Sequence, residues 1–224
     1  MAVPADPPSD DVPTTPRGGK RRDLVVAARR VFGRDGYARA SIDAIAAEAA
    51  VSTRTLYNHF GSKERLFAEV LTESATEVSD GFAALADEGL AAVDRNDPAA
   101  VLGALGHAMR GHRGGNPEHF AMVRQINAEA GHFPADVIEA WQEAGPRRVQ
   151  RRVAEELERL AAAGRLALED PALEALQLTA LVGLRREGAA YAATADAPEA
   201  ARRAEDAAIV AAGVRTFLHG RAAR

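Results

Sequence analysis

Between residues 22 and 71 one sequence pattern occurs three times: a serine precedes a short run of apolar residues at helical spacing. This pattern restricts the fold of the segment to a few possibilities. Ser41, Ser52 and Ser62 can each cap the first turn of a helix with the side-chain oxygen. A further run with the i, i+3, i+4, i+7 spacing precedes the first of these serines. We therefore expect four helices, the middle two short and joined by a tight connection at residues 50–51. Such a pair, flanked by helices that supply a core, forms a helix-turn-helix.

The third of these segments, Thr53 to Phe60, has two contrasting faces. Leu56 and Phe60 are spaced i and i+4, so both point to the interior. The opposite side of this helix enters the major groove in a helix-turn-helix, where Arg54 can make a bidentate contact to guanine. The residues expected to contact DNA are Thr53 and Arg54 at base edges, Tyr57, His59 and Lys63 at phosphates, and Ser41, Ser52, Thr55 and Asn58 beside them.

Charge is unevenly distributed along the chain. The whole sequence carries −4, but residues 17–65 contain eleven Lys or Arg and five acids, which gives +6. The first 16 residues carry −3, so the remainder after residue 65 carries −7. A localised basic segment is typical of a DNA-binding surface, and an acidic remainder is repelled by the duplex.

The first 19 residues are rich in Pro and poor in large apolar side chains, so we expect a disordered tail. The first helix is then expected to begin at about Arg22. The basic residues at the end of the tail, Arg17 and Lys20 to Arg22, have two interpretations. They either keep the tail soluble or form an arm that reaches phosphates or the minor groove.

The segment Ser41 to Phe67, SIDAIAAEAAVSTRTLYNHFGSKERLF, resembles the DNA-binding domain of the tetracycline-repressor (TetR) family. Nearly every position matches the family pattern, from the first Ser through Ile-Ala, Val-Ser, Thr-Leu-Tyr and His-Phe to Ser-Lys-Glu. Ala50 departs from it, because the family usually has Gly in the turn; if the turn needs a positive φ, Ala costs about 1 kcal/mol there. The resemblance implies a homodimeric transcriptional regulator, usually a repressor, that binds a double-stranded DNA operator and is released by a small-molecule effector.

The rest of the chain also favours helices, since Ala recurs in helix-length runs and no useful strand alternation occurs. We expect an all-α protein with an N-terminal three-helix helix-turn-helix DNA-binding domain at residues 20–66 and a larger C-terminal helical ligand-binding and dimerisation domain at residues 67–224. Beyond the fourth helix, which Ser62 caps, the expected helices are 97–112, 117–131, 134–144, 146–164, 171–192 and 198–220. There is no Cys for disulfides, and no apolar run suits a membrane span or a signal peptide, so we expect a cytoplasmic protein.

The apolar residues of the last two expected helices indicate oligomerisation. Residues 207–220, AAIVAAGVRTFLHG, are apolar nearly all round, so one face can pack within the subunit while another needs a partner. The residues that fit such a partner are Leu173, Leu176, Ala180 and Leu184 on one face of the preceding helix, with Ala212 and Gly213 allowing close approach. Either these are core helices of a monomer, or they form a four-helix interface of a homodimer, which the resemblance favours. A two-fold dimer predicts a palindromic operator.

The effector pocket leaves the weakest trace in the sequence. Because TetR-family members bind effectors among the helices of the C-terminal domain, the candidate residues are His107, Met109, Phe120, Met122, Arg124, Phe133 and Trp141. The aromatic and Met side chains could equally belong to the core or to an interface. Arg124 could meet an anionic ligand or pair with an acid within the protein.

Other functional classes find less support. The chain has no His-x-x-x-His pair, so no metal is expected, and no cofactor is implied. An enzyme is not expected either, because the sequence contains no nucleophile elbow, phosphate-binding Gly loop or paired metal motif. A DNA-binding scaffold that responds to no small molecule stays open as an alternative.

Overall fold

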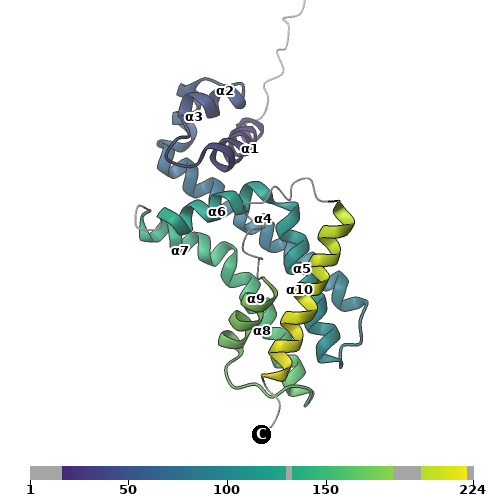
Figure 1. Ribbon diagram of the computed structural model, residues 1–224. Coiled ribbons are helices and arrows are strands. Elements are labelled where there is room, and N and C mark those ends of the chain that lie inside the picture. The colour runs from purple at the N-terminus through teal and green to yellow at the C-terminus, as the bar shows by residue number, and fades with distance from the viewer. Residues whose placement is uncertain (1–16, 130–132, 184–197, 221–224) are drawn as a thin grey trace, which may run out of the picture.

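The computed structural model describes residues 17–129, 133–183 and 198–220, which form ten α-helices and no strand (Figure 1). The helices are α1 (Arg17–Asp35), α2 (Ile42–Glu48), α3 (Thr53–Phe60), α4 (Lys63–Ala91), α5 (Pro98–Gly115), α6 (Pro117–Glu129), α7 (Ala135–Ala144), α8 (Pro146–Ala162), α9 (Pro171–Val182) and α10 (Glu199–His219). The all-α fold is confirmed, with α1, α2 and α3 forming a head at one end of a larger helical body. None of the described helices combines the length and apolarity needed to cross a bilayer.

The three serine caps predicted in this region are present. Each Oγ accepts a hydrogen bond from the backbone amide three residues later, at 3.0 Å for Ser41, 3.1 Å for Ser52 and 3.2 Å for Ser62. These bonds satisfy amides that the first turn of a helix leaves without a partner. Gly61, with a φ of 76°, ends α3 directly after Phe60, as predicted.

The connection between α2 and α3 turns at Ala50, whose φ is 52°. Among the described residues it is the one non-glycine with a positive φ. The amide of Val51 donates to the carbonyl of Ala46 at 2.9 Å and closes the turn. Ala at this φ is strained by about 1–2 kcal/mol, so the predicted conflict between Ala50 and the shape of the turn is confirmed.

Helix α1 begins at Arg17, earlier than the sequence suggested. The expectation of a start at about Arg22 overlooked tertiary contacts of the first turns. Arg21 forms an ion pair with Glu69 on α4, and its guanidinium lies 5.6 Å from the ring centroid of Phe60 on α3. Residues 17–19 are therefore helical rather than part of a tail, and residues 1–16 lie outside the described part of the chain.

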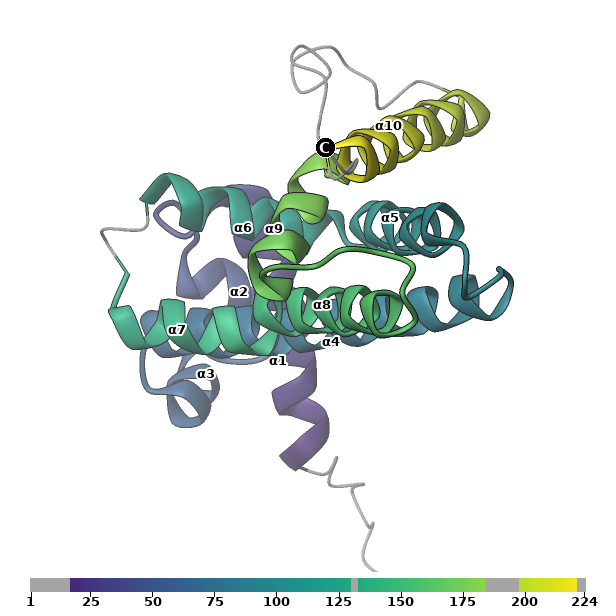
Figure 2. The same ribbon diagram turned by 90° about the horizontal axis from the view of Figure 1, so that it is seen from below.

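Two apolar cores follow one another along the molecule, and α4 contributes side chains to both. Figures 1 and 2 show the path of α4 from the head into the body. The head-side core joins α1, α2, α3 and the first half of α4 to α6 and α7. At its centre, the Phe67 ring lies 5.0 Å from Phe32, 4.9 Å from Tyr37 and 5.2 Å from Phe133. Apolar packing thus continues across residue 66, where the sequence suggested a domain boundary, and that boundary stays an expectation.

The body core lies at the other end of α4 and includes side chains of α5, α8, α9 and α10. Helices α9 and α10 pack closely, because a Cβ on Gly213 would lie only 3.0 Å from the backbone of Leu181. Gly213 therefore permits close approach within one subunit, whereas the sequence left open which helices it brings together. Helix α9 ends at Val182 with Gly183 as its C-cap, and residues 184–192 of the expected 171–192 helix, with Leu184, lie outside the described residues.

Candidate DNA-binding surface and ligand cavity

Helix α3 presents the two faces that the sequence predicted. Leu56 and Phe60 are buried in the head-side core. Arg54 and Asn58 are exposed, and 50% of the Tyr57 surface is accessible. Thr53 and His59 are half-buried at the edges of this face. A helix held from behind by two large apolar side chains, with polar groups on its free side, has the form needed to enter a major groove.

Three other predicted DNA-contacting residues are already engaged in capping. Ser41 Oγ and Ser52 Oγ accept amide hydrogen bonds at the starts of α2 and α3. The hydroxyls of Ser52 and Thr55 also share a hydrogen bond of 2.9 Å. These side chains fix the ends of the two helices, so any contact they make with DNA would be additional to this structural role.

Lys63 sits at the base of the head rather than on the face of α3. Its ammonium lies 4.7 Å from the ring centroid of Tyr37 and donates to the carbonyl of Ala38 at 3.4 Å. The hydroxyl of Tyr37 donates to Glu64 at 3.1 Å, and burial together with this carboxylate raises the pKa of Tyr37 to about 12. Lys63 thus helps to join α4 to the loop after α1, and its phosphate contact stays a prediction.

The head contains two kinds of basic side chain. Arg21, Arg29 and Arg30 form ion pairs with Glu69, Glu77 and Glu48 respectively, which neutralises part of the predicted charge. Five others are exposed and form no ion pair with the described residues: Lys20, Arg22, Arg39, Arg54 and Arg65. Arg39 and Arg65 were counted in the basic segment of the sequence but were not singled out, because helical periodicity gives no signal for a cation in a loop or on an outer turn.

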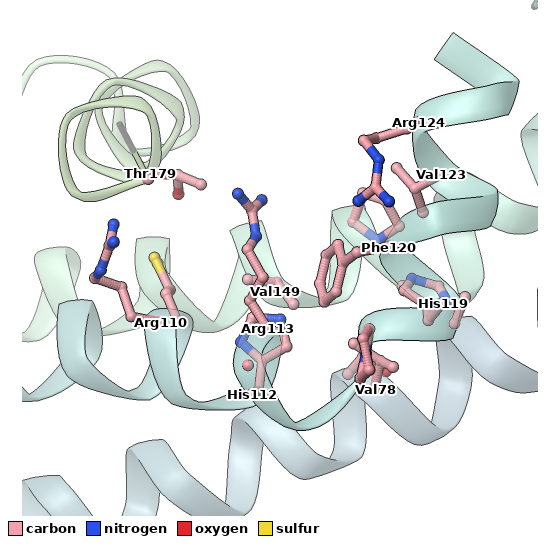
Figure 3. A pocket seen from close by; sticks show the side chains of 18 of the residues that line it. Val78, Arg110, His112, Arg113, His119, Phe120, Val123, Arg124, Val149 and Thr179 are labelled. Carbon is pink, nitrogen blue, oxygen red and sulfur yellow. The ribbon is translucent and has the colours of Figure 1, made fainter. Parts of the chain in front are cut away.

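A cavity of about 760 Å³ lies in the body, with walls from α4, α5, α6, α7, α8, α9 and α10 (Figure 3). This volume suits a drug-sized ligand. Four predicted residues line it: Met109, Phe120, Arg124 and Trp141. Apolar and aromatic groups make up much of the remaining wall, including Val78, Val123 and Val149.

The other three candidate residues do not line this cavity, and their role as pocket residues stays a prediction. His107 is exposed on a different face of α5. Met122 is fully buried in the head-side core. Phe133 packs 5.2 Å from Phe67 and 5.3 Å from Tyr37 in that same core. Both lie there because α6 and residues 133–144 cover the head as well as the cavity, which no periodicity within one helix reveals.

Two histidines that the sequence did not single out as pocket residues line the cavity near Phe120. His119 and His112 lie 5.0 Å and 5.6 Å from the Phe120 ring, measured between centroids. Burial lowers the pKa of both histidines, and for His119 burial and the charge of Arg29 lower it to about 4. His119 is also held by a hydrogen bond of 2.9 Å between its Nδ1 and the hydroxyl of Ser74. Both rings are therefore neutral at physiological pH.

Helices α9 and α10 leave an apolar strip on the outside of the body. Leu173 and Leu176 keep 50% and 49% of their surface accessible, and Ala180 is exposed beside them. On α10 the inner side is buried in the body core, whereas Ala211 and Ala212 are exposed. Large exposed apolar side chains next to small ones are typical of a surface that a second subunit covers.

The head and the body together define a helix-turn-helix transcriptional regulator, not an enzyme. The family model for bacterial regulatory proteins of the tetR family matches residues 24–70. The model for the C-terminal domain of AefR-like transcriptional repressors matches residues 101–220, which is more than half of the chain. The protein therefore belongs to the TetR family.

Individual relatives agree with this assignment. The HTH-type transcriptional activator FasR of Mycolicibacterium smegmatis is 41% identical over 66 residues, a match that covers 30% of this chain and 30% of FasR. A TetR-family regulator from Mesorhizobium loti has a TM-score of 0.75 at 26% identity, covering 92% of this chain and 98% of its own. The flavonoid-responsive regulator FrrA has a TM-score of 0.64 at 29% identity, covering 91% of this chain and 97% of its own.

Proposed function

We propose that the protein is a homodimeric repressor that binds a palindromic DNA operator through α3 and leaves it when a small molecule occupies the cavity. The observation that carries this proposal is the position of α6, which lines the cavity on one side and packs against α1 of the head on the other. A ligand that displaces α6 would therefore act on the head directly.

Specific contacts support this connection between α6 and the head. Gln125 of α6 accepts a hydrogen bond from the amide of Tyr37 at 3.1 Å, and its own amide donates to the carbonyl of Phe32 at 3.5 Å. A Cβ on Gly33 would lie 3.3 Å from Glu118, so the two helices approach closely there. Helix α4 offers a second route, since it runs from the head through both cores. The ligand must favour the arrangement that binds DNA less well, or the equilibrium would not shift.

The dimer is proposed from the exposed strip of Leu173, Leu176 and Ala180 on α9 with Ala211 and Ala212 on α10. Two such strips related by a two-fold axis would form a four-helix interface and place two α3 helices on one side of a duplex. The relative FrrA is named as flavonoid-responsive, which supports a small organic effector here. A regulator of this kind acts on chromosomal DNA, so we expect it in the cytoplasm.

The first experiment is selection of binding sites from a random duplex library with the full-length protein. A palindromic consensus would support the dimeric regulator, and the absence of enrichment at low salt would overturn the proposal. The consensus duplex then serves to screen small molecules that release the protein. A DNA-binding scaffold without an effector, the alternative from the sequence, predicts that none does. Reporter expression with the operator between promoter and gene distinguishes repression from activation.

Arg54→Ala tests the proposed DNA-binding face, because this side chain is exposed near the start of α3. We expect a loss of about 1–3 kcal/mol on the selected operator and a relaxed preference at one base pair. Lys63→Ala is the comparison, and it should weaken all duplexes alike and lower the salt slope by about one. If repeated selection with the Arg54→Ala protein returned an unchanged consensus, Arg54 would not read a base.

A further inference from the structure

The described part of the cavity wall carries more positive than negative charge. The charged side chains that line it are Arg110, Arg113, Arg124, Arg202, Glu205 and Asp206. Arg110 is held within the protein, since it forms an ion pair with Asp206 and donates to the carbonyl of Val182 at 3.2 Å. The described wall thus holds four guanidinium groups and two carboxylates, of which Arg110 and Asp206 pair with each other.

Two of these arginines converge on one aromatic ring. Arg113 of α5 lies over Phe120, with its guanidinium carbon 4.9 Å from the ring centroid. Arg124 follows Phe120 by four positions on α6, so it lies on the same face of the helix. Figure 3 shows both guanidinium groups on the same side of the cavity, with the Phe120 ring between them in this view. Arg124 forms no hydrogen bond or ion pair with any residue that the structure describes.

Aromatic and apolar side chains surround Phe120 in this part of the cavity. Phe120 has the neutral rings of His119 and His112 against it, at 5.0 Å and 5.6 Å. Val123 and Met109 also line the cavity. A guanidinium presents paired N–H donors that match a carboxylate or sulfonate, and its planar face stacks on rings.

We propose that the effector is an aromatic organic anion, whose carboxylate or sulfonate binds Arg113 and Arg124 and whose ring packs on Phe120 and the apolar wall. This inference rests on the proposed function, because it names the chemical class of the molecule that occupies the regulatory cavity. A neutral or cationic effector of the same shape would leave the guanidinium of Arg124 without a counterion and would bind more weakly.

The test compares two fluorescent probes with the full-length protein in the absence of DNA. One is 8-anilinonaphthalene-1-sulfonate, and the other is N-phenyl-1-naphthylamine, which has the same rings without the sulfonate. We expect Arg124→Met and Arg113→Met each to weaken binding of the sulfonate by about tenfold or more. The neutral probe should change by less than about twofold, since Met preserves the apolar part of the site. Arg124→Lys should restore part of the sulfonate affinity.

Arg165→Met is the matched control, because Arg165 is exposed and lies outside the cavity. Its affinity for both probes should equal that of the wild type. The proposal is overturned if the two cavity variants bind the sulfonate like the wild type, which would place the probe elsewhere, for example on the exposed strip of α9 and α10. It is equally overturned if both probes weaken to the same extent, since charge would then contribute nothing.

The outcome of this test is separate from that of the proposed function. Probe binding that depends on Arg113 and Arg124, but that leaves operator affinity unchanged, would support the anion site and contradict a coupling of the cavity to DNA. Operator release by neutral compounds, with no dependence on either arginine, would support regulation and contradict the anion site.

Discussion

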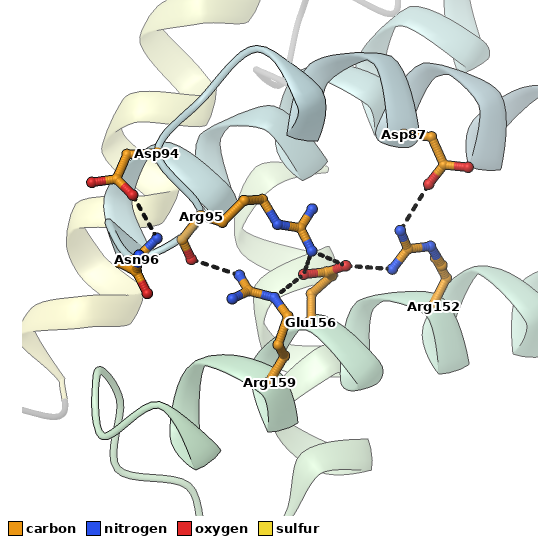
Figure 4. A network of polar contacts seen from close by, with 7 residues as sticks. All are labelled: Asp87, Asp94, Arg95, Asn96, Arg152, Glu156 and Arg159. Atoms are coloured by element: carbon orange, nitrogen blue, oxygen red, sulfur yellow. Dashed lines mark hydrogen bonds and ion pairs between the residues drawn. The ribbon is translucent and has the colours of Figure 1, made fainter.

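The two cores of the molecule differ in composition and in what they hold together. The head-side core is rich in aromatic rings, which pack around Phe67 and bind α6 and α7 to the head. The body core contains mainly Val, Leu and Ala and has Glu156 at its edge, a buried carboxylate surrounded by three arginines (Figure 4). The cavity touches both, since Trp141 belongs to the first core and Val149 packs against the second. A molecule bound in the cavity would thus contact two separately packed units.

We expect the largest loss of stability from truncation of a buried side chain in each core. Phe67→Ala and Phe82→Ala each remove a fully buried ring, from the head-side core and the body core respectively, and should cost about 3–5 kcal/mol. Trp141, the single tryptophan of the chain, reports on the head-side core. In thermal unfolding, Phe67→Ala should lower the midpoint temperature measured by tryptophan fluorescence more than the midpoint temperature measured by far-UV circular dichroism. Phe82→Ala should do the reverse, and equal shifts by both probes in both variants would mean one cooperative unit.

Glu156→Gln tests the ionic edge of the body core. The carboxylate is 5% exposed and accepts hydrogen bonds from Arg95 at 2.7 Å, Arg152 at 2.6 Å and Arg159 at 2.9 Å. Burial alone would raise the pKa of Glu156, but these three arginines together lower it to about 2. Removing the charge leaves the guanidinium groups without their shared partner, so we expect a loss of about 2–4 kcal/mol in urea unfolding at pH 7.

The sign of the pH effect follows from the lowered pKa of Glu156. Its stabilisation is fully present above the ordinary pKa of 4.5 and is lost as the pH falls from there towards 2. Glu158→Gln is the matched control, since Glu158 is exposed on the same helix. This substitution should change the free energy of unfolding little. If the two variants had equal stability, the arginine cluster would be a surface feature and not part of the body core.

His119 lies where the head-side core, the cavity and α4 meet, and it should make folding sensitive to mild acid. The unfolded chain protonates this histidine below about pH 6.5, whereas the folded protein does so only below about 4. The free energy of unfolding therefore does not depend on protonation of this histidine above about pH 6.5. It falls by about 1–3 kcal/mol in all as the pH drops from 6.5 towards 4, because the unfolded chain binds the proton first. His119→Gln should flatten the pH dependence of unfolding in this window, and unfolding followed from pH 7 to pH 4 in the wild type and in this variant measures this.

The sequence predicted what local physics determines. Ser52 caps α3, Leu56 and Phe60 turn inward, and Ala50 has the positive φ that the missing glycine implied, because each depends on neighbours within one or two turns. The cavity was only partly predicted, since it depends on which faces of distant helices meet. The ion pair of Arg110 with Asp206 joins residues that are 96 positions apart, so it could not be predicted from the spacing of residues within one helix.

The smallest expected effect concerns the turn of the head, where strain rather than packing is at issue. Ala50→Gly removes a backbone strain of about 1–2 kcal/mol from the folded protein, because glycine tolerates a φ of 52°. The same change stabilises the unfolded chain by about 0.4–1 kcal/mol, because glycine raises its conformational entropy. We therefore expect a net gain of about 0.5–1 kcal/mol in urea unfolding followed by circular dichroism.

Ala47→Gly is the matched control for this substitution, because Ala47 is also exposed but lies within α2, where Gly costs about 1 kcal/mol. The same chemical change should thus have opposite signs at two positions only three residues apart. A loss of stability at both would mean that the turn holds no strain. Unchanged operator affinity in Ala50→Gly would place the strain in the folding energy alone, whereas weaker binding would mean that the strained turn helps to hold α3 in the orientation that DNA requires.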